Sequence, residues 1–148
     1  MSKLLEGKKG LILGVANKRS IAWAIAQSLS REGAELGFTY QGERLEENVR
    51  TLAETLPHSL IFPCNVTQEA EIESVFKKIE DAWGGLDFLI HCVAYAKGED
   101  IEGSFVKTKK DTFLRFMRLV LKEYPYVFFS SRKFCSRLRI IGSRRIDH

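Results

Sequence analysis

Short apolar runs alternate with amphipathic stretches over the first 95 residues of the chain. Four runs rich in Val, Ile, Leu and Phe predict buried strands over 9–15, 34–40, 59–66 and 86–95. Between them, apolar residues recur at helical spacing and predict helices over 20–31, 43–56 and 68–83. Strands that alternate with helices favour a parallel sheet, because parallel neighbours need crossover connections. The pattern therefore predicts an α/β protein with the order βαβαβαβ.

Two of the predicted helices show a clear apolar face. On the first helix this face comprises Ile21, Ala24, Ile25 and Leu29, and on the third it comprises Ile72, Val75, Phe76 and Ile79. We expect these residues to pack on a doubly wound sheet. Ligands of such sheets bind at the carboxyl ends of the strands, so the turns that follow the strands are the candidate site.

The first of these turns carries the stretch GVANKRSIAWAIA, which begins at Gly14. The first turn of a helix offers unpaired N–H groups and the positive end of the helix dipole to an anion. Ser20 is placed to cap this helix and to offer its hydroxyl to a phosphate. The stretch is not the three-glycine dinucleotide fingerprint, so a plain strand–helix turn with a capping serine is an equal interpretation of these residues alone.

Three longer segments carry a family resemblance. They are GKKGLILGVANKRSIAWAIAQSLSREGAELGFTYQ, FPCNVTQEAEIESVF and GGLDFLIHCVAYAKGEDIEGSFVKTKKDTFL. Together they resemble the bacterial NADH-dependent enoyl-acyl-carrier-protein reductases, a branch of the short-chain dehydrogenase/reductase family, from about Leu5 to Leu114. The resemblance implies the amino-terminal half of a Rossmann-type doubly wound sheet. It also implies reduction of an enoyl-acyl-carrier-protein in fatty acid biosynthesis with NADH, by a homotetramer.

The resemblance also assigns residues to the binding of cofactor and substrate. They are Gly14, Ser20 and Ile21 at the pyrophosphate, Gln41 at the adenine ribose, Asn65 and Val66 at the adenine, Val93 at the nicotinamide-side ribose, and Ala96 at the acyl substrate. Asn65 stands where the family generally has aspartate, and its carbonyl can still accept a hydrogen bond from the adenine amino group. For Val66 and Val93, ordinary core packing is the alternative.

The end of the second predicted strand bears on the choice of cofactor. The stretch TYQGERLEEN places the neutral Gln41 there, and Glu43 and Arg44 follow. An NADP site needs cations for the 2′-phosphate, so the sequence favours NADH. Arg44 is the reservation, because its guanidinium could accept a phosphate.

The chemistry of the family needs a tyrosine and a lysine seven positions after it on the same helix. Tyr126 and Lys133 have this spacing. A crossover unit takes ~30 residues, however, and there is no room for one between Leu114 and Tyr126. We therefore predict that this chain contains no catalytic residue and does not turn over.

The character of the sequence changes near Leu114. Residues 115–148 carry nine Lys or Arg against two acidic residues, a net charge of +7, whereas residues 1–114 carry 14 against 17, a net charge of −3. A change of reading frame near Leu114 would explain this change, and it predicts a nucleotide-binding half-domain over 1–114 followed by a tail unrelated to the family. Two alternatives stay open: a basic arm that binds nucleic acid or a membrane surface, and a half-domain that binds a cofactor or partner without catalysis.

Length and composition agree with one globular domain in the cytoplasm. The chain has 148 residues, of which 45% are hydrophobic, and its first residues, MSKLLEGKKG, lack the apolar core of a secretory signal. No stretch approaches transmembrane length. Cys64, Cys92 and Cys135 are widely spaced, which suits neither a disulfide framework nor a zinc site. We expect reduced thiols, no metal, and neither nucleic acid nor membrane as a partner.

Overall fold

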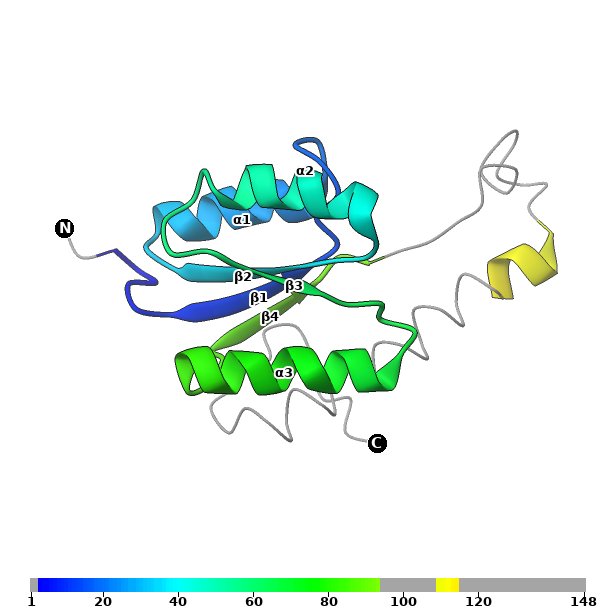
Figure 1. Ribbon diagram of the computed structural model, residues 1–148. Helices are drawn as coiled ribbons and strands as arrows, with labels where there is room; N and C mark the ends of the chain where they lie inside the picture. The colour runs from blue at the N-terminus through cyan, green and yellow to red at the C-terminus, as the bar shows by residue number, and fades with distance from the viewer. Residues whose placement is uncertain (1–2, 94–108, 115–148) are drawn as a thin grey trace, which may run out of the picture.

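A computed structural model describes residues 3–93 and 109–114. Strands and helices alternate along the chain, as the sequence predicts (Figure 1). The elements are β1 (Lys9–Leu13), α1 (Ile21–Arg31), β2 (Glu35–Tyr40), α2 (Glu43–Ala53), β3 (Leu60–Pro63), α3 (Glu69–Trp83) and β4 (Phe88–His91). Residues 110–114 form one further short helix.

The four strands form one parallel sheet in the order β3–β2–β1–β4. β1 pairs with β2 on one side and with β4 on the other, so the chain changes the direction in which it adds strands between β3 and β4. A reversal of strand order of this kind is the switch point beside which open α/β sheets bind ligands. The predicted α/β sheet of parallel strands is confirmed.

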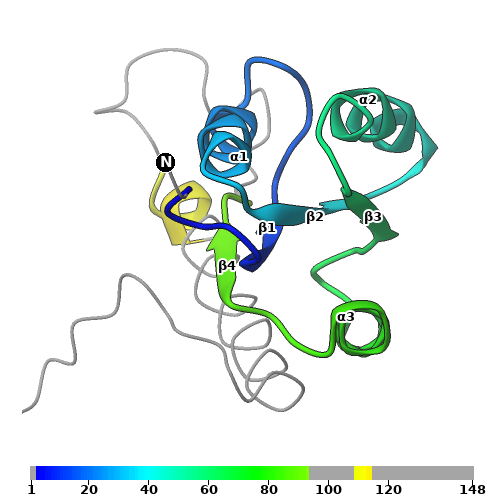
Figure 2. The same cartoon turned by 90° about the vertical axis from the view of Figure 1, so that its left-hand side faces the viewer.

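Helices cover both faces of the sheet, with α1 and α2 on one face and α3 on the other (Figure 2). Each face has its own buried apolar cluster, one around Phe38 and Val49 and the other around Phe76 and Ile79. The face predicted for α3 is confirmed, because Ile72, Val75, Phe76 and Ile79 are its buried residues.

The packing face predicted for α1 is wrong. Its buried residues are Ala22, Trp23 and Ala26. Ile21 is 76% exposed, and Ala24 is also exposed. The ring of Trp23 packs in a tilted arrangement on Phe38, with 6.0 Å between ring centroids. Burial of this large ring and close approach of two alanines rotate the helix away from the face that the sequence pattern favours.

Helix α2 ends at Ala53, three residues before the predicted end. Hydroxyl groups beyond this point satisfy the last carbonyls of the helix. The hydroxyl of Thr55 donates to the carbonyl of Leu52, and that of Ser59 donates to the carbonyls of Ala53 and Leu56. Side-chain hydroxyls of this kind compete with helical hydrogen bonds and favour termination of a helix.

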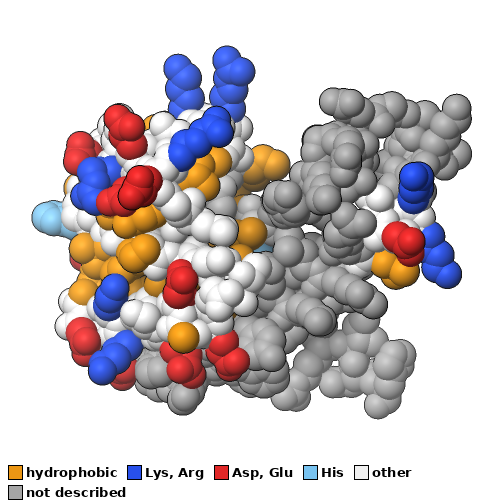
Figure 3. Space-filling model, turned by 45° about the vertical axis from the view of Figure 1, so that its right-hand side comes forward, with side chains coloured by type: hydrophobic (Ala, Val, Ile, Leu, Met, Phe, Trp, Pro, Cys, Tyr) orange, Lys and Arg blue, Asp and Glu red, His pale blue; other side chains and the backbone are white. Residues whose placement is uncertain are grey.

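Charged side chains of both signs are interspersed over the described surface seen in Figure 3. Apolar side chains lie between them in small groups. Within the described ranges, no helix combines the length and the apolar character needed to cross a membrane.

Candidate functional site

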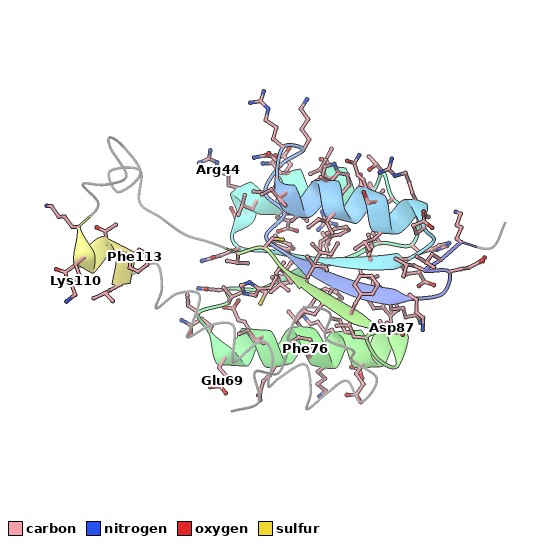
Figure 4. All side chains as sticks on the ribbon, turned by 180° about the vertical axis from the view of Figure 1, so that it is seen from behind. Arg44, Glu69, Phe76, Asp87, Lys110 and Phe113 are labelled. Atoms are coloured by element: carbon pink, nitrogen blue, oxygen red, sulfur yellow. The ribbon has the colours of Figure 1, made fainter. Side chains whose placement is uncertain are left out.

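The carboxyl ends of the four strands lie along one edge of the sheet, where α1, α2 and α3 begin. Figure 4 shows Arg44 and Glu69, at the starts of α2 and α3, at this end of the molecule, and Asp87, which precedes β4, at the other. The sites predicted from sequence at Gly14, Gln41 and Asn65 all follow strands that end here. The fold therefore brings these separate segments to one edge.

Gly14 lies where the chain leaves β1 and passes the backbone that follows β4. Its φ is +101°, in the region that favours glycine. A Cβ atom on Gly14 would lie 2.3 Å from the carbonyl oxygen of Cys92 and 2.6 Å from its carbonyl carbon. Backbone conformation and close contact both exclude a side chain here, which leaves the main chain of this turn accessible to a ligand.

Ser20 is the N-cap residue of α1, but its side chain does not cap the helix. The hydroxyl turns back into the preceding loop, where it donates to the carbonyl of Asn17 and accepts a hydrogen bond of 3.4 Å from the N–H of Ala16. The predicted capping hydrogen bond is therefore wrong. The loop carbonyl competes successfully for the hydroxyl because it lies three residues away, within reach of a short side chain.

The first turn of α1 is suited to an anion. No described residue accepts a hydrogen bond from the N–H of Ile21 or Ala22. The first turn of α1 contains no acidic residue, whereas those of α2 and α3 contain Glu43 and Glu46, and Glu69 and Glu71. Free N–H groups, the helix dipole and the absence of carboxylates together fit a phosphate or pyrophosphate.

Gln41 directly follows β2 and is exposed, and Gly42 is the N-cap of α2. Arg44 lies in the first turn of α2, is exposed, and projects from the sheet end in Figure 4. One neutral and one cationic side chain thus stand at the end of the strand next to β1.

Asn65 is held in a tight turn after β3. Its N–H donates to the carboxylate of Glu71 at 2.6 Å, and its Oδ1 accepts from the N–H and the hydroxyl of Thr67 at 3.0 and 2.7 Å. The carbonyl that the sequence analysis reserves for the adenine is thus already used twice, and the amide nitrogen is the part left for a ligand. Sequence reasoning missed Glu71 and Thr67 as supports of this turn, although the Asn-x-Thr pattern is a signal for it.

Val66 is buried among Leu13, Ile72 and other core residues, and Val93 is half-buried against the same cluster. Both therefore contribute to packing at the sheet edge. Ala96, Tyr126 and Lys133 lie outside the described residues.

The titratable groups at this edge are poorly suited to proton transfer. Burial raises the pKa of the Cys64 thiol to about 12 and also raises that of Cys92. Burial lowers the pKa of His91, at the end of β4, below its usual 6.5. At neutral pH the two thiols and this imidazole are uncharged, so this edge provides a binding surface without an activated nucleophile among these three groups.

Comparison with known proteins places this architecture in a family. The sequence model described as Enoyl-(Acyl carrier protein) reductase matches residues 14–130. The chain belongs to this family. The match includes residues 115–130, on the far side of the boundary predicted at Leu114, which remains a prediction.

Two curated relatives show how much of the family the chain represents. It is 50% identical over 114 residues to enoyl-acyl-carrier-protein reductase (NADH) FabI of Bacillus cereus, which covers 76% of this chain and 44% of that protein. It is 40% identical over 126 residues to enoyl-acyl-carrier-protein reductase (NADH) 1 of Rhizobium meliloti, which covers 85% of this chain and 46% of that protein. The chain thus spans less than half the length of these relatives.

Solved structures of similar proteins contain nicotinamide cofactors. The reductase from Anaplasma phagocytophilum in complex with NAD has a TM-score of 0.80 and 36% identity, over 90% of this chain and 51% of that one. The Bacillus cereus reductase with NADP+ and indole naphthyridinone has a TM-score of 0.81 and 39% identity, over 98% of this chain and 60% of that one. The predicted family and fold are confirmed.

Proposed function

We propose that this chain is the cofactor-binding part of an NADH-dependent enoyl-acyl-carrier-protein reductase. The observation that carries the proposal is the turn from β1 to α1. There a glycine at φ +101° allows two backbone segments to approach, and the first turn of α1 offers unused N–H groups without a carboxylate. Such a site suits the pyrophosphate of a dinucleotide. Relatives of known structure bind NAD or NADP+, which supports the same assignment.

The predicted site residues take the following roles in this proposal. Gly14, Ser20 and Ile21 surround the pyrophosphate, Gln41 meets the adenine ribose, Asn65 and Val66 flank the adenine, Val93 lies beside the nicotinamide-side ribose, and Ala96 contacts the acyl group. Asn65 donates from its amide nitrogen, because its carbonyl is held by Thr67. When bound, the cofactor supplies a hydride; these residues hold and orient it.

A matched pair of glycine variants tests the binding site. Gly14→Ala introduces a Cβ that meets the backbone of Cys92, whereas Gly84→Ala introduces one at φ +70° with nothing within 4 Å. Both carry the strain of a left-handed backbone, but Gly84 follows α3, at the opposite end of the sheet. We expect isothermal titration to show at least a tenfold loss of NADH affinity for Gly14→Ala and no change for Gly84→Ala. Equal affinity in both variants would contradict the proposal.

We further propose that the 148-residue polypeptide does not reduce an enoyl thioester by itself. The resemblance requires a tyrosine and a lysine seven positions apart, and the tyrosine in the described ranges, Tyr40, is followed at that distance by Glu47. Without a donor and a cation at the developing enolate, the transition state is not stabilised. We expect no enoyl-dependent oxidation of NADH. Steady oxidation that is lost in Tyr126→Phe would show that Tyr126 and Lys133 are catalytic.

The assignment of residues 115–148 rests on the sequence alone. We propose a change of reading frame near Leu114, and the encoding DNA around that codon tests it: a second frame that continues the family sequence is expected. The alternative of a basic arm for nucleic acid or membrane falls on residues outside the described ranges, and the family matches give it no support. The homotetramer and the cytoplasmic location remain predictions.

A further inference from the structure

The cationic side chain closest in sequence to the proposed ribose site is Arg44. It stands three residues after Gln41, in the first turn of α2, and is exposed. β2 and β1 are neighbours in the sheet, so the turn that bears Arg44 is adjacent to the turn that bears Gly14. Figure 4 shows the guanidinium directed outward at the end of the molecule where the strands end.

The two arginines of α2 differ in their partners. Arg50 forms an ion pair of 2.6 Å with Glu46, one turn earlier. Arg44 forms no hydrogen bond or ion pair with a described residue. Glu46 is committed to Arg50 and also lies close enough to Tyr40 to raise the pKa of its hydroxyl. The guanidinium of Arg44 therefore retains its donors for a ligand.

A phosphate is the ligand that this side chain fits. Guanidinium groups bind phosphate oxygens through two parallel hydrogen bonds, and an arginine near the end of the second strand is the position from which an α/β sheet contacts a 2′-phosphate. Glu43 and Glu47 lie on the same helix and oppose a second negative charge, while Lys18 and Arg19 in the neighbouring turn favour one. The surrounding charge is thus mixed, so the contribution of one arginine can decide the outcome.

We propose that Arg44 binds the 2′-phosphate of NADPH, so that this site accepts both nicotinamide nucleotides and Arg44 determines the ratio of their affinities. The proposal rests on the proposed dinucleotide site. NADH remains the preferred ligand because Gln41 is neutral and two carboxylates flank Arg44. NADPH binds within about tenfold of NADH because one guanidinium offsets those carboxylates.

The test compares three variants by isothermal titration with NADH and with NADPH. Arg44→Gln removes the guanidinium, and Arg44→Lys keeps the charge but not the paired hydrogen bonds. Arg31→Gln is the matched control, because it removes an equal charge from the last turn of α1, at the other end of the sheet. For Arg44→Gln we expect at least a tenfold loss of affinity for NADPH and less than a twofold change for NADH. Arg44→Lys is expected to be intermediate, and Arg31→Gln unchanged.

Salt provides a second measurement. Affinity for NADPH should fall more steeply with ionic strength than affinity for NADH, and Arg44→Gln should remove most of that difference. If the native chain binds NADH and Arg44→Gln changes both affinities equally, or neither, the role of Arg44 is refuted while the dinucleotide site stands. If the native chain binds neither nucleotide, the proposed function itself fails.

Discussion

The ring of Phe88 on β4 lies over the Cα atom of Gly10 on β1, its partner in the parallel register. A Cβ atom on Gly10 would come within 1.9 Å of that ring, which is only 7% exposed and has little room to move. We expect Gly10→Ala to lower the free energy of unfolding by about 1–3 kcal/mol through overpacking. Urea denaturation measures this change.

A double-mutant cycle isolates the cause of that loss. Phe88→Leu shortens the side chain that the new methyl group would meet, so Gly10→Ala should cost less in the Phe88→Leu background than in the native chain. Additive costs would mean that the ring is not the obstacle.

Asp87 ties the start of β4 to the start of β1. One carboxylate oxygen accepts the N–H of Lys9 at 2.9 Å, and the other pairs with the ammonium of Lys8 at 3.1 Å. The Lys8 side chain is more than half exposed, so Lys8→Met should change the free energy of unfolding by less than about 1 kcal/mol. Asp87→Ala should cost more, about 1–2 kcal/mol, because the Lys9 N–H also loses its acceptor. Equal costs in thermal unfolding would refute the backbone contact as the larger contribution.

His91 makes the stability of the sheet sensitive to mild acid. Burial lowers the pKa of its imidazole below 6.5, so the unfolded chain binds a proton more readily than the folded chain. The stabilising effect of a neutral His91 is therefore complete above pH 6.5 and is lost as the pH falls through the folded pKa. We expect the unfolding midpoint in urea to drop between pH 7.5 and 5.5, and His91→Gln to drop less. A midpoint that rises on acidification in the native chain would contradict this explanation.

Among the described strands, β4 has a neighbour on one side only. Its residues Leu89 and Ile90, and Val93 beyond it, are half-buried. An apolar parallel strand at an edge is prone to association, so we expect the isolated polypeptide to aggregate or to unfold without a sharp transition. Size-exclusion chromatography and urea titration are the measurements. A stable monomer with a steep transition would show that the edge is adequately covered.

Local chemistry predicted the order of the elements, and tertiary contacts decided what it missed. The apolar period of α3 identified its buried face because four large residues share it. The face of α1 was missed because packing of Trp23 on Phe38, a contact between separate elements, fixes its rotation. The hydroxyl of Ser20 was assigned to the helix but binds the loop, since sequence does not distinguish two acceptors equally near. Gly14 and Gln41 were placed correctly at a strand end, because strand ends follow from the same apolar pattern.

The pairing of β1 with β4 joins residues far apart in sequence, as the hydrogen bond between Lys9 and Asp87, 78 positions away, illustrates. During synthesis on the ribosome, β1 emerges long before its second neighbour exists, and only β2 is available to pair with it early. One side of the central strand must wait while the whole β2–α3 segment is made. Chain growth at 5–20 residues per second makes that wait on the order of several seconds. The side of β1 that completes the turn at Gly14 is therefore the last part of the sheet to close in the nascent chain, and it is the part most dependent on protection by chaperones.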